Sequence, residues 1–188
     1  GLSAALGTSP MPVRDALRQL LVDQAIELLP NRVFRVPIMT RSRFIELRDI
    51  RLRLEGLAVE RAARVITQEE VREVALLSAT INREYFSSEP NASELIVLNK
   101  DLHFAAYRAA RMPVLLQIIE GLWTQIGPVL SLDVRHGSRR ITERIACEHH
   151  DALVKALAAG DSQGAVDALV ADIMSAGDYI LSLGKLPP

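Results

Sequence analysis

Long stretches of helical periodicity constrain the fold of this chain more than any other feature of its sequence. Between Ser42 and Val65 the apolar residues recur every three or four positions over about six turns, which is typical of one apolar face of a helix. These residues are Phe44, Leu47, Ile50, Leu54, Leu57, Ala58 and Ala62. Hydrophobic residues make up 49% of the chain but aromatic residues only 4%. This balance favours helices packed on helices over a β-sandwich or a barrel.

The same periodicity extends to the end of the chain. Thr67 followed by Glu70 forms a capping box, which opens a helix. The stretch "AAGD" before Ser162 breaks the pattern once more. We expect helices over residues 42–65, 67–86, 95–110, 113–130, 141–158 and 162–183. The fold predicted for residues 39–188 is therefore an all-α, six-helix antiparallel bundle.

The first 38 residues predict a separate, smaller unit. Gly7 ends a short helical pattern, and Ser9 and Pro12 suit the start of a second helix. The apolar stripe of that helix consists of Val13, Ala16, Leu17, Leu20 and Leu21. Two short β-prone runs then flank a turn signal at Pro30 and Asn31. Helix, turn, helix and hairpin are the elements of a winged helix-turn-helix. Because no cap precedes the opening apolar residues, we expect the N-terminal part of this unit to be missing.

The second helix of this unit has the position of a helix that enters the major groove of DNA. Arginines at its start and on the hairpin would then reach phosphates and base edges. The residues expected to contact DNA are Ser9, Pro12, Arg14, Arg18 and Arg32, with Arg35 as a further candidate. The alternative is a solvated helix beside a hairpin, which serves as a protein-interaction module. The spacing alone leaves both open.

Composition limits the partners and the compartment. The formal net charge of −1 gives no whole-chain attraction to nucleic acid, so DNA would have to be bound by a local patch. The single cysteine, Cys147, excludes an internal disulfide and suits a reducing cytoplasm. There is no uninterrupted apolar run of about 18 residues and no export signal, so we predict a cytoplasmic protein with no membrane partner.

The opening stretch "LSAALGTSPMPVRDALRQLLVDQAIELLPNRVFRV" resembles the DNA-binding domain of GntR-superfamily repressors. The resemblance runs from Leu2 to about Val36, and the "PVR" and "AL" motifs of the helix start are in phase with the family pattern. It implies a winged helix-turn-helix that binds operator DNA. Three positions depart from the pattern: Pro10 and Met11 stand where the family usually has Arg and Thr, and Val33 replaces the glycine of the wing.

Placed on the predicted helices, the histidines suggest a metal site. Asn99 and His103 are four residues apart, so they lie on one face of a helix about one turn from each other. His150 and Asp172 fall on two later helices that a break allows to run antiparallel. Two imidazoles, a carboxylate and an amide oxygen would suit a divalent ion such as Zn, Ni or Mn. The alternative is that these histidines are ordinary polar residues of a helix bundle.

Residues from about Phe44 to Leu183 resemble the FCD domain, the all-helical C-terminal ligand domain found with this type of DNA-binding head. The resemblance lies in three stretches: "IRLRLEGLAVERAA", "NKDLHFAAYRAARMPVL" and "HDALVKALAAGDSQGAVDALVADI". Carried over by position, the metal ligands would be Asn99, His103, His150 and Asp172. The alignment selects His150 over His149. Asp172 stands where the family usually has a third histidine, and Asn99 where it often has aspartate.

Arg51 falls on the arginine of the first of these stretches, and the resemblance implies that it projects into the same cavity. There its guanidinium would bind the carboxylate of a small organic acid. The alternative is a structural ion pair with Glu55, one helical turn away.

The resemblance implies a ligand-responsive transcriptional regulator, in which a small carboxylate effector alters operator binding by a homodimer. Two other functions remain as alternatives: a metal-dependent hydrolytic enzyme, and an interaction module that has lost DNA binding. The sequence offers no clear general base beside the metal ligands and opens with a DNA-binding pattern, so we expect no enzymatic activity.

Overall fold

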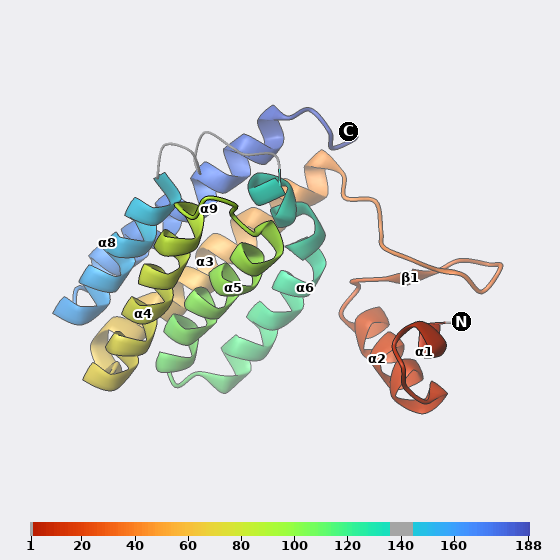
Figure 1. Ribbon diagram of the computed structural model, residues 1–188, viewed down its shortest axis with the longest axis horizontal. Helices are drawn as coiled ribbons and strands as arrows, with labels where there is room; N and C mark the ends of the chain where they lie inside the picture. Colours follow the sequence, from red (N-terminus) through yellow and green to blue (C-terminus); the bar gives the residue numbers. More distant parts are fainter. Residues whose placement is uncertain (1, 136–144) are drawn as a thin grey trace.

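The chain folds into a helical bundle with a small N-terminal head beside it (Figure 1). The computed structural model describes residues 2–135 and 145–188, without the side chains of residues 131–135. The head contains α1 (Leu2–Ala5), α2 (Pro10–Val22), β1 (Glu27–Leu28) and β2 (Phe34–Arg35). The bundle contains α3 (Arg41–Val65), α4 (Gln68–Tyr85), α5 (Ala92–Ala109), α6 (Pro113–Arg135), α8 (Ile145–Ala159) and α9 (Ser162–Ser182). The prediction of an all-α bundle is confirmed.

Helix boundaries follow capping signals that are local in the sequence. Thr67 accepts a hydrogen bond from the backbone N–H of Glu70, and the Glu70 carboxylate accepts one from the backbone N–H of Thr67, so the predicted capping box is present. The Asn91 and Asp161 side chains cap α5 and α9 by accepting hydrogen bonds from backbone N–H groups of the first turn. Gly160, with φ of +68°, ends α8 at the predicted break. The predicted start of the fifth helix at Ile141 lies outside the described residues.

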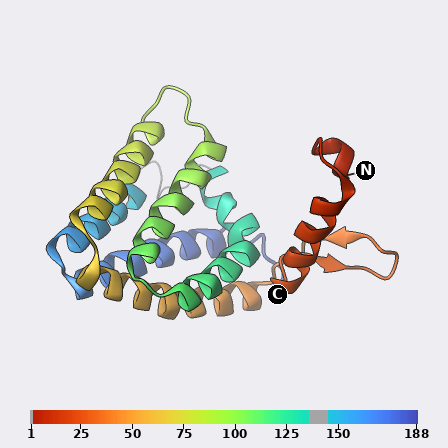
Figure 2. The same cartoon turned by 90° about the horizontal axis from the view of Figure 1, so that it is seen from below.

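Helix α3 packs against α5, α6, α8 and α9. Its most extensive contacts are with α9, which in turn packs against α8, while α4 packs against α5 and α8. Figure 2 shows α3 extending along the length of the bundle, with the head joined to its N-terminal end. The main hydrophobic core includes residues of α3, α4, α5, α6, α8 and α9. A second core cluster, with Phe44, Leu122 and Ile180, lies at the end of α3 nearer the head.

The buried face of α3 differs from the expected apolar stripe. Ile50 and Leu57, which belong to that stripe, are 39% and 45% exposed. Arg51 and Glu55 are buried instead, 4% and 0% exposed. The reason is that α3 packs against α5, α6 and α9, and Glu55 on its packed face meets Tyr107 of α5 and Trp123 of α6. Helical periodicity locates apolar positions, but it does not exclude a buried ion pair from the face that packs.

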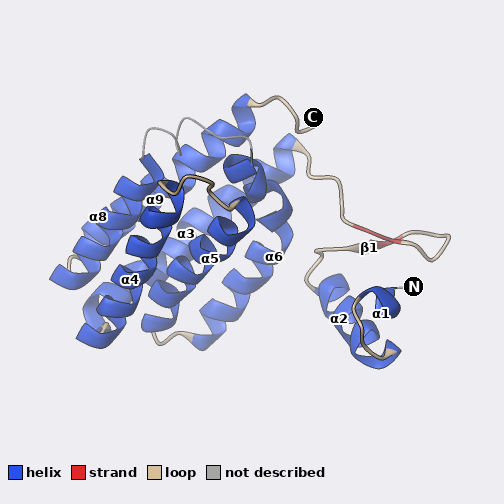
Figure 3. Ribbon diagram, in the orientation of Figure 1, coloured by secondary structure: helices blue, strands red, loops and turns tan. Residues whose placement is uncertain are grey.

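Strand structure in the described residues is confined to the head (Figure 3). β1 and β2 pair antiparallel, with Glu27 opposite Arg35, and the turn between them contains the predicted Pro30–Asn31. Val13 and Ala25 are the buried apolar residues of this unit. Of the predicted stripe of α2, Val13 is buried, Leu17, Leu20 and Leu21 are half-buried, and Ala16 is exposed. Within the described part of the chain, no helix is both long enough and apolar enough to cross a membrane.

Candidate metal centre

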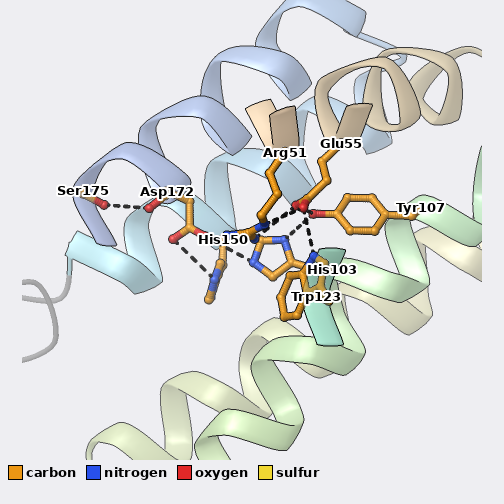
Figure 4. A network of polar contacts seen from close by, with 8 residues as sticks. All are labelled: Arg51, Glu55, His103, Tyr107, Trp123, His150, Asp172 and Ser175. Atoms are coloured by element: carbon orange, nitrogen blue, oxygen red, sulfur yellow. Dashed lines mark hydrogen bonds and ion pairs between the residues drawn. The ribbon is translucent and has the colours of Figure 1, made fainter. Parts of the chain in front are cut away.

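Two histidines and an aspartate from three different helices meet inside the bundle. His103 lies on α5, His150 on α8 and Asp172 on α9, and their side chains are 2%, 1% and 8% exposed. One nitrogen or oxygen atom from each residue lies within 4.8 Å of the others. The close packing of α8 on α9 brings His150 and Asp172 together. The structure thus gathers three of the four ligands that the sequence predicts (Figure 4).

The separations between these donor atoms suit a divalent ion. His103 Nε2 lies 3.2 Å from Asp172 Oδ2, and His150 Nε2 lies 3.7 Å from Asp172 Oδ1. Two ligands bound at about 2.0–2.1 Å to a tetrahedral ion lie about 3.3 Å apart. Two imidazoles and a carboxylate are donors that Zn, Ni and Mn accept. The two separations to Asp172 and the chemistry of the three donors therefore fit a divalent cation.

Asn99, the fourth predicted ligand, lies one turn before His103 on α5 and is half-buried. Helical spacing puts both residues on one face of α5, so Asn99 is suitably placed to supply an amide oxygen from the same side. Its participation remains a prediction.

Arg51 forms the ion pair with Glu55 that the sequence left as one of two possibilities. The Arg51 Nε donates to Glu55 Oε1 at 2.7 Å, and its Nη2 donates to Oε2 at 3.3 Å. The guanidinium carbon also lies 4.9 Å from the ring centroid of Trp123, a cation–π contact. Burial opposes the positive charge of Arg51, but the charge and hydrogen bonds of Glu55 outweigh it, so the pKa of Arg51 is raised.

Glu55 is the centre of a buried hydrogen-bond network that sequence analysis did not find. Its carboxylate accepts a hydrogen bond from the Tyr107 hydroxyl at 2.5 Å and another from Trp123 Nε1 at 2.9 Å. The Tyr107 hydroxyl also lies 3.1 Å from His103 Nδ1, so the network reaches the candidate metal ligands (Figure 4). Burial, followed by the negative charge of Glu55, raises the pKa of Tyr107 well above its usual value.

One part of this network had a signal in the sequence. Tyr107 follows His103 by four residues on α5, and Glu55 follows Arg51 by four on α3, so each pair shares a helix face. Trp123 has no such signal, because 68 residues separate it from Glu55 and only the packing of α6 on α3 brings them together.

The residues predicted to contact DNA lie on the exposed surface of the head. Ser9 is the N-cap residue of α2, and Pro12 lies in the first turn of this helix. Arg14 and Arg18 project from α2 into solvent, although Arg18 Nη1 lies 3.5 Å from Asp15. Arg32 lies in the hairpin turn with φ of +61°.

Arg35, the further candidate, donates from Nε to Glu27 Oε1 across the hairpin at 2.7 Å, so part of its charge is neutralised within the head.

Comparison with known proteins identifies the family. The model of the FCD domain matches residues 46–174. A transcriptional regulator of Escherichia coli (strain K12), the HTH-type regulator McbR, is 31% identical over 181 residues, which cover 96% of this chain and 80% of McbR. The Nta operon transcriptional regulator of Aminobacter aminovorans is 25% identical, over 97% of this chain and 82% of that protein. The chain belongs to the FCD-domain family of GntR-type transcriptional regulators.

Solved structures agree with this assignment. The structure of E. coli McbR matches with a TM-score of 0.87 and 27% identity, and covers 98% of this chain and 85% of its own. A metal-free FCD domain matches with a TM-score of 0.62 over 78% of this chain and 96% of its own; at 19% identity it shows the likeness of fold alone. Since its relatives are named transcriptional regulators, this FCD-family chain is a regulator of that type and not an enzyme.

Proposed function

We propose that this regulator is a ligand-responsive, DNA-binding repressor or activator, in which residues 1–38 bind operator DNA and residues 39–188 sense a small carboxylate. The observation that carries the proposal is the buried convergence of His103, His150 and Asp172 from three helices. Buried polar groups of this kind are expensive to maintain unless they are paired or bind an ion. A divalent ion held by these three residues, with Asn99 as a fourth ligand, supplies positive charge to which an effector carboxylate can bind.

The charges around the site support the ion as the group that attracts the effector. With neutral imidazoles, Asp172 and Glu55 contribute two negative charges and Arg51 one positive charge. A divalent cation changes this balance from −1 to +1, so a carboxylate is attracted only when the ion is present. Arg51 was the residue expected to bind the effector directly. To do so, its guanidinium would have to leave the two hydrogen bonds that it donates to Glu55.

The head is suited to binding DNA through α2 and the hairpin. Arg14 and Arg18 on α2 and Arg32 in the wing turn are exposed, and Ser9 and Pro12 lie at the end of α2 where a phosphate would approach. Replacement of Arg14 or Arg32 by alanine is expected to weaken operator binding. If the arginine binds a phosphate, the substitution should also make the slope of the salt dependence shallower by about one unit.

The exposed face shared by α3 and α6 is suited to a second copy of the chain. Ile50 and Leu57 on α3 are 39% and 45% exposed, and Val114 and Ile118 on α6 are 72% and 50% exposed. A two-fold axis perpendicular to α3 would place Ile50 of one copy against Leu57 of the other. The same operation would bring Glu46, at one end of this face, opposite Arg61 at the other, so the charges are self-complementary.

This dimer can be tested by one substitution and a matched control. Leu57→Glu places a charge on the proposed contact and should convert a particle of twice the chain mass to one of the chain mass in light scattering. Leu76→Glu makes the same change at an apolar residue of α4 that is 64% exposed and lies away from this face. It should leave the mass unchanged. A monomeric wild-type chain would remove the proposed dimer.

Helix α3 offers a physical route from the effector to the operator. It carries Arg51 and Glu55 of the buried network, Ile50 and Leu57 of the proposed dimer face, and the segment that leads into the head. A shift of α3 when ion and effector bind would change the separation of the two heads. Because binding equilibria are reciprocal, operator DNA must then change the affinity for the effector by the same factor.

The proposal is tested by operator binding in defined metal states. Metal-free protein is mixed with DNA from upstream of its own gene, first alone, then with zinc chloride, then with zinc and acetate, lactate or succinate in turn. A change in affinity that requires zinc and one carboxylate, and that is absent in Asp172→Ala, supports the proposal. If the protein binds the DNA specifically but its affinity changes with neither zinc nor any carboxylate, the proposed sensor function is refuted. If the protein does not bind the DNA specifically, the alternative of a protein-interaction module is favoured. Pro10, Met11 and Val33, which depart from the family pattern in the head, are the reason for keeping this alternative.

A further inference from the structure

The hydroxyl of Tyr107 has two hydrogen-bonding atoms within reach but only one proton to donate. It lies 2.5 Å from Glu55 Oε2 and 3.1 Å from His103 Nδ1. A phenol donates one hydrogen bond and can accept others, whereas each nitrogen of a neutral imidazole is either a donor or an acceptor. The direction of the Tyr107 hydroxyl therefore decides which nitrogen of His103 carries its proton.

The other contacts of Glu55 determine that direction. The guanidinium of Arg51 and the indole N–H of Trp123 are hydrogen-bond donors only, and both donate to the Glu55 carboxylate. Paired with Arg51, Glu55 is a carboxylate, which accepts hydrogen bonds at both oxygens and donates none. The contact at 2.5 Å between two oxygens must then contain the Tyr107 proton. The raised pKa of Tyr107 agrees with this, because burial keeps the phenol protonated.

With its proton directed to Glu55, Tyr107 can only accept from His103. We propose that Tyr107, oriented by Glu55, is a positioning residue that holds the proton of His103 on Nδ1 and so presents the bare Nε2 to a metal ion shared with Asp172. The inference rests on the proposed metal site and assigns to that site a residue that supports one of its ligands. A metal-bound histidine commonly donates its other N–H to a protein acceptor, which fixes the tautomer and the orientation of the ring.

The opposite arrangement conflicts with the distances. If Nε2 carried the proton and donated it to Asp172 Oδ2, Nδ1 would have to accept from the Tyr107 hydroxyl. The oxygens of Tyr107 and Glu55 would then face each other at 2.5 Å without a proton between them. With the proton on Nδ1, both contacts of the Tyr107 hydroxyl have a proton between their atoms. The bare Nε2 then lies 3.2 Å from Asp172 Oδ2, a separation suited to two ligands of one cation.

The first test is the ¹⁵N spectrum of the histidine side chains in the wild-type, zinc-loaded protein. We expect His103 Nδ1 to be the protonated nitrogen, with a slowly exchanging proton, and Nε2 to be the metal-bound nitrogen. Because this measurement uses no variant, it stands even where a substitution impairs folding. Zinc bound through Nδ1, or a proton on Nε2, would overturn the inference while leaving the metal site intact.

The second test is the substitution Tyr107→Phe, which keeps the ring that packs against His103 and Phe104 and removes only the hydroxyl. We expect zinc affinity, measured by competition with a chelator, to fall by about 10–100-fold, as is typical for loss of such a support. The slow exchange of the Nδ1 proton should disappear as well. Tyr85→Phe makes the same change at the last residue of α4 and should alter neither.

The outcomes separate this inference from the proposed function. Unchanged zinc affinity and an unchanged His103 spectrum in Tyr107→Phe would show that the hydroxyl has no positioning role, although the metal site would survive. If the wild-type protein binds no zinc, the proposed metal site is refuted, and the positioning role of Tyr107 is refuted with it.

Discussion

Replacement of Glu55 by glutamine is the sharpest test of the buried network. Glu55 is 0% exposed and accepts four hydrogen bonds from Arg51, Tyr107 and Trp123. Glutamine has nearly the same shape, but it offers one acceptor oxygen and a donor NH₂ group. The NH₂ group would face other donors, and the charge of Arg51 would remain buried without its counterion.

The size of the effect follows from the burial of both partners. Removal of one partner from a buried ion pair typically destabilises a protein by about 3–5 kcal/mol. For a chain of this length each kcal/mol lowers Tm by about 2–4 °C, so we expect a decrease of roughly 6–20 °C. Both proteins are unfolded by heat in the presence of a chelator, because a bound ion would add its own stabilisation. Circular dichroism at the helical band reports the transition.

A surface pair provides the control. Glu73 is 57% exposed on its side chain and lies 3.9 Å from Arg108. Exposed pairs contribute about 0–1 kcal/mol, so Glu73→Gln should lower Tm by no more than about 4 °C. If Glu55→Gln lowers Tm no more than Glu73→Gln, Glu55 does not hold the buried network together, and the tautomer assigned to His103 has no support.

Three further predictions concern the ion, acid stability and a helix end. Zinc at about 100 times its Kd should stabilise the wild-type protein by about 2.7 kcal/mol and raise its Tm accordingly. Most of this rise should be absent in Asp172→Ala. An equal rise in both proteins would show that zinc binds elsewhere. A hydrogen bond from Arg111, followed by one from the backbone of Thr67, lowers the pKa of Glu70 to about 2. Because this folded-state value lies below the ordinary 4.5, the stabilisation is present above pH 4.5 and is lost as the pH falls toward 2. Glu70→Gln should therefore flatten the decline of Tm in that window, and a curve as steep as that of the wild type would contradict the assignment. Gly160→Ala should destabilise by about 1–2 kcal/mol, because φ of +68° disfavours a side chain, whereas Gly127→Ala within α6, where a Cβ meets nothing within 4 Å, should be neutral or stabilising. Equal thermal transitions for these two variants would refute that reasoning.

The helices were predictable because their signals are local. The capping box at Thr67, the cap and break around Gly160, and the periodicity of each segment depend on neighbours within a few residues. The ends were less exact: α6 continues to Arg135, beyond the predicted end at residue 130, because helical structure extends into a polar stretch that periodicity does not mark.

The site was only partly predictable for the same reason. His103, His150 and Asp172 were selected by helical spacing and by resemblance to the FCD domain, and the fold brings them together. The pairing of Arg51 with Glu55 was visible as an alternative, since the two are one turn apart.

The burial of that pair, and its connection through Tyr107 to His103, depend on which face of α3 meets its neighbours. Single-helix periodicity does not contain that information: it assigned Ile50 and Leu57 to the same apolar stripe as buried residues, and both are exposed.

Helix α3 runs unbroken for 25 residues. Over such a rod each residue adds about 1.5 Å and 100° of rotation. Insertion or deletion of one residue between Ile50 and Glu55 would leave both halves helical but turn the head, and Ile50 of the proposed dimer face, by about 100° relative to Glu55. Substitutions in α3 should consequently be tolerated better than insertions or deletions. Among members of the family, the number of residues in α3 should vary less than the identity of its side chains.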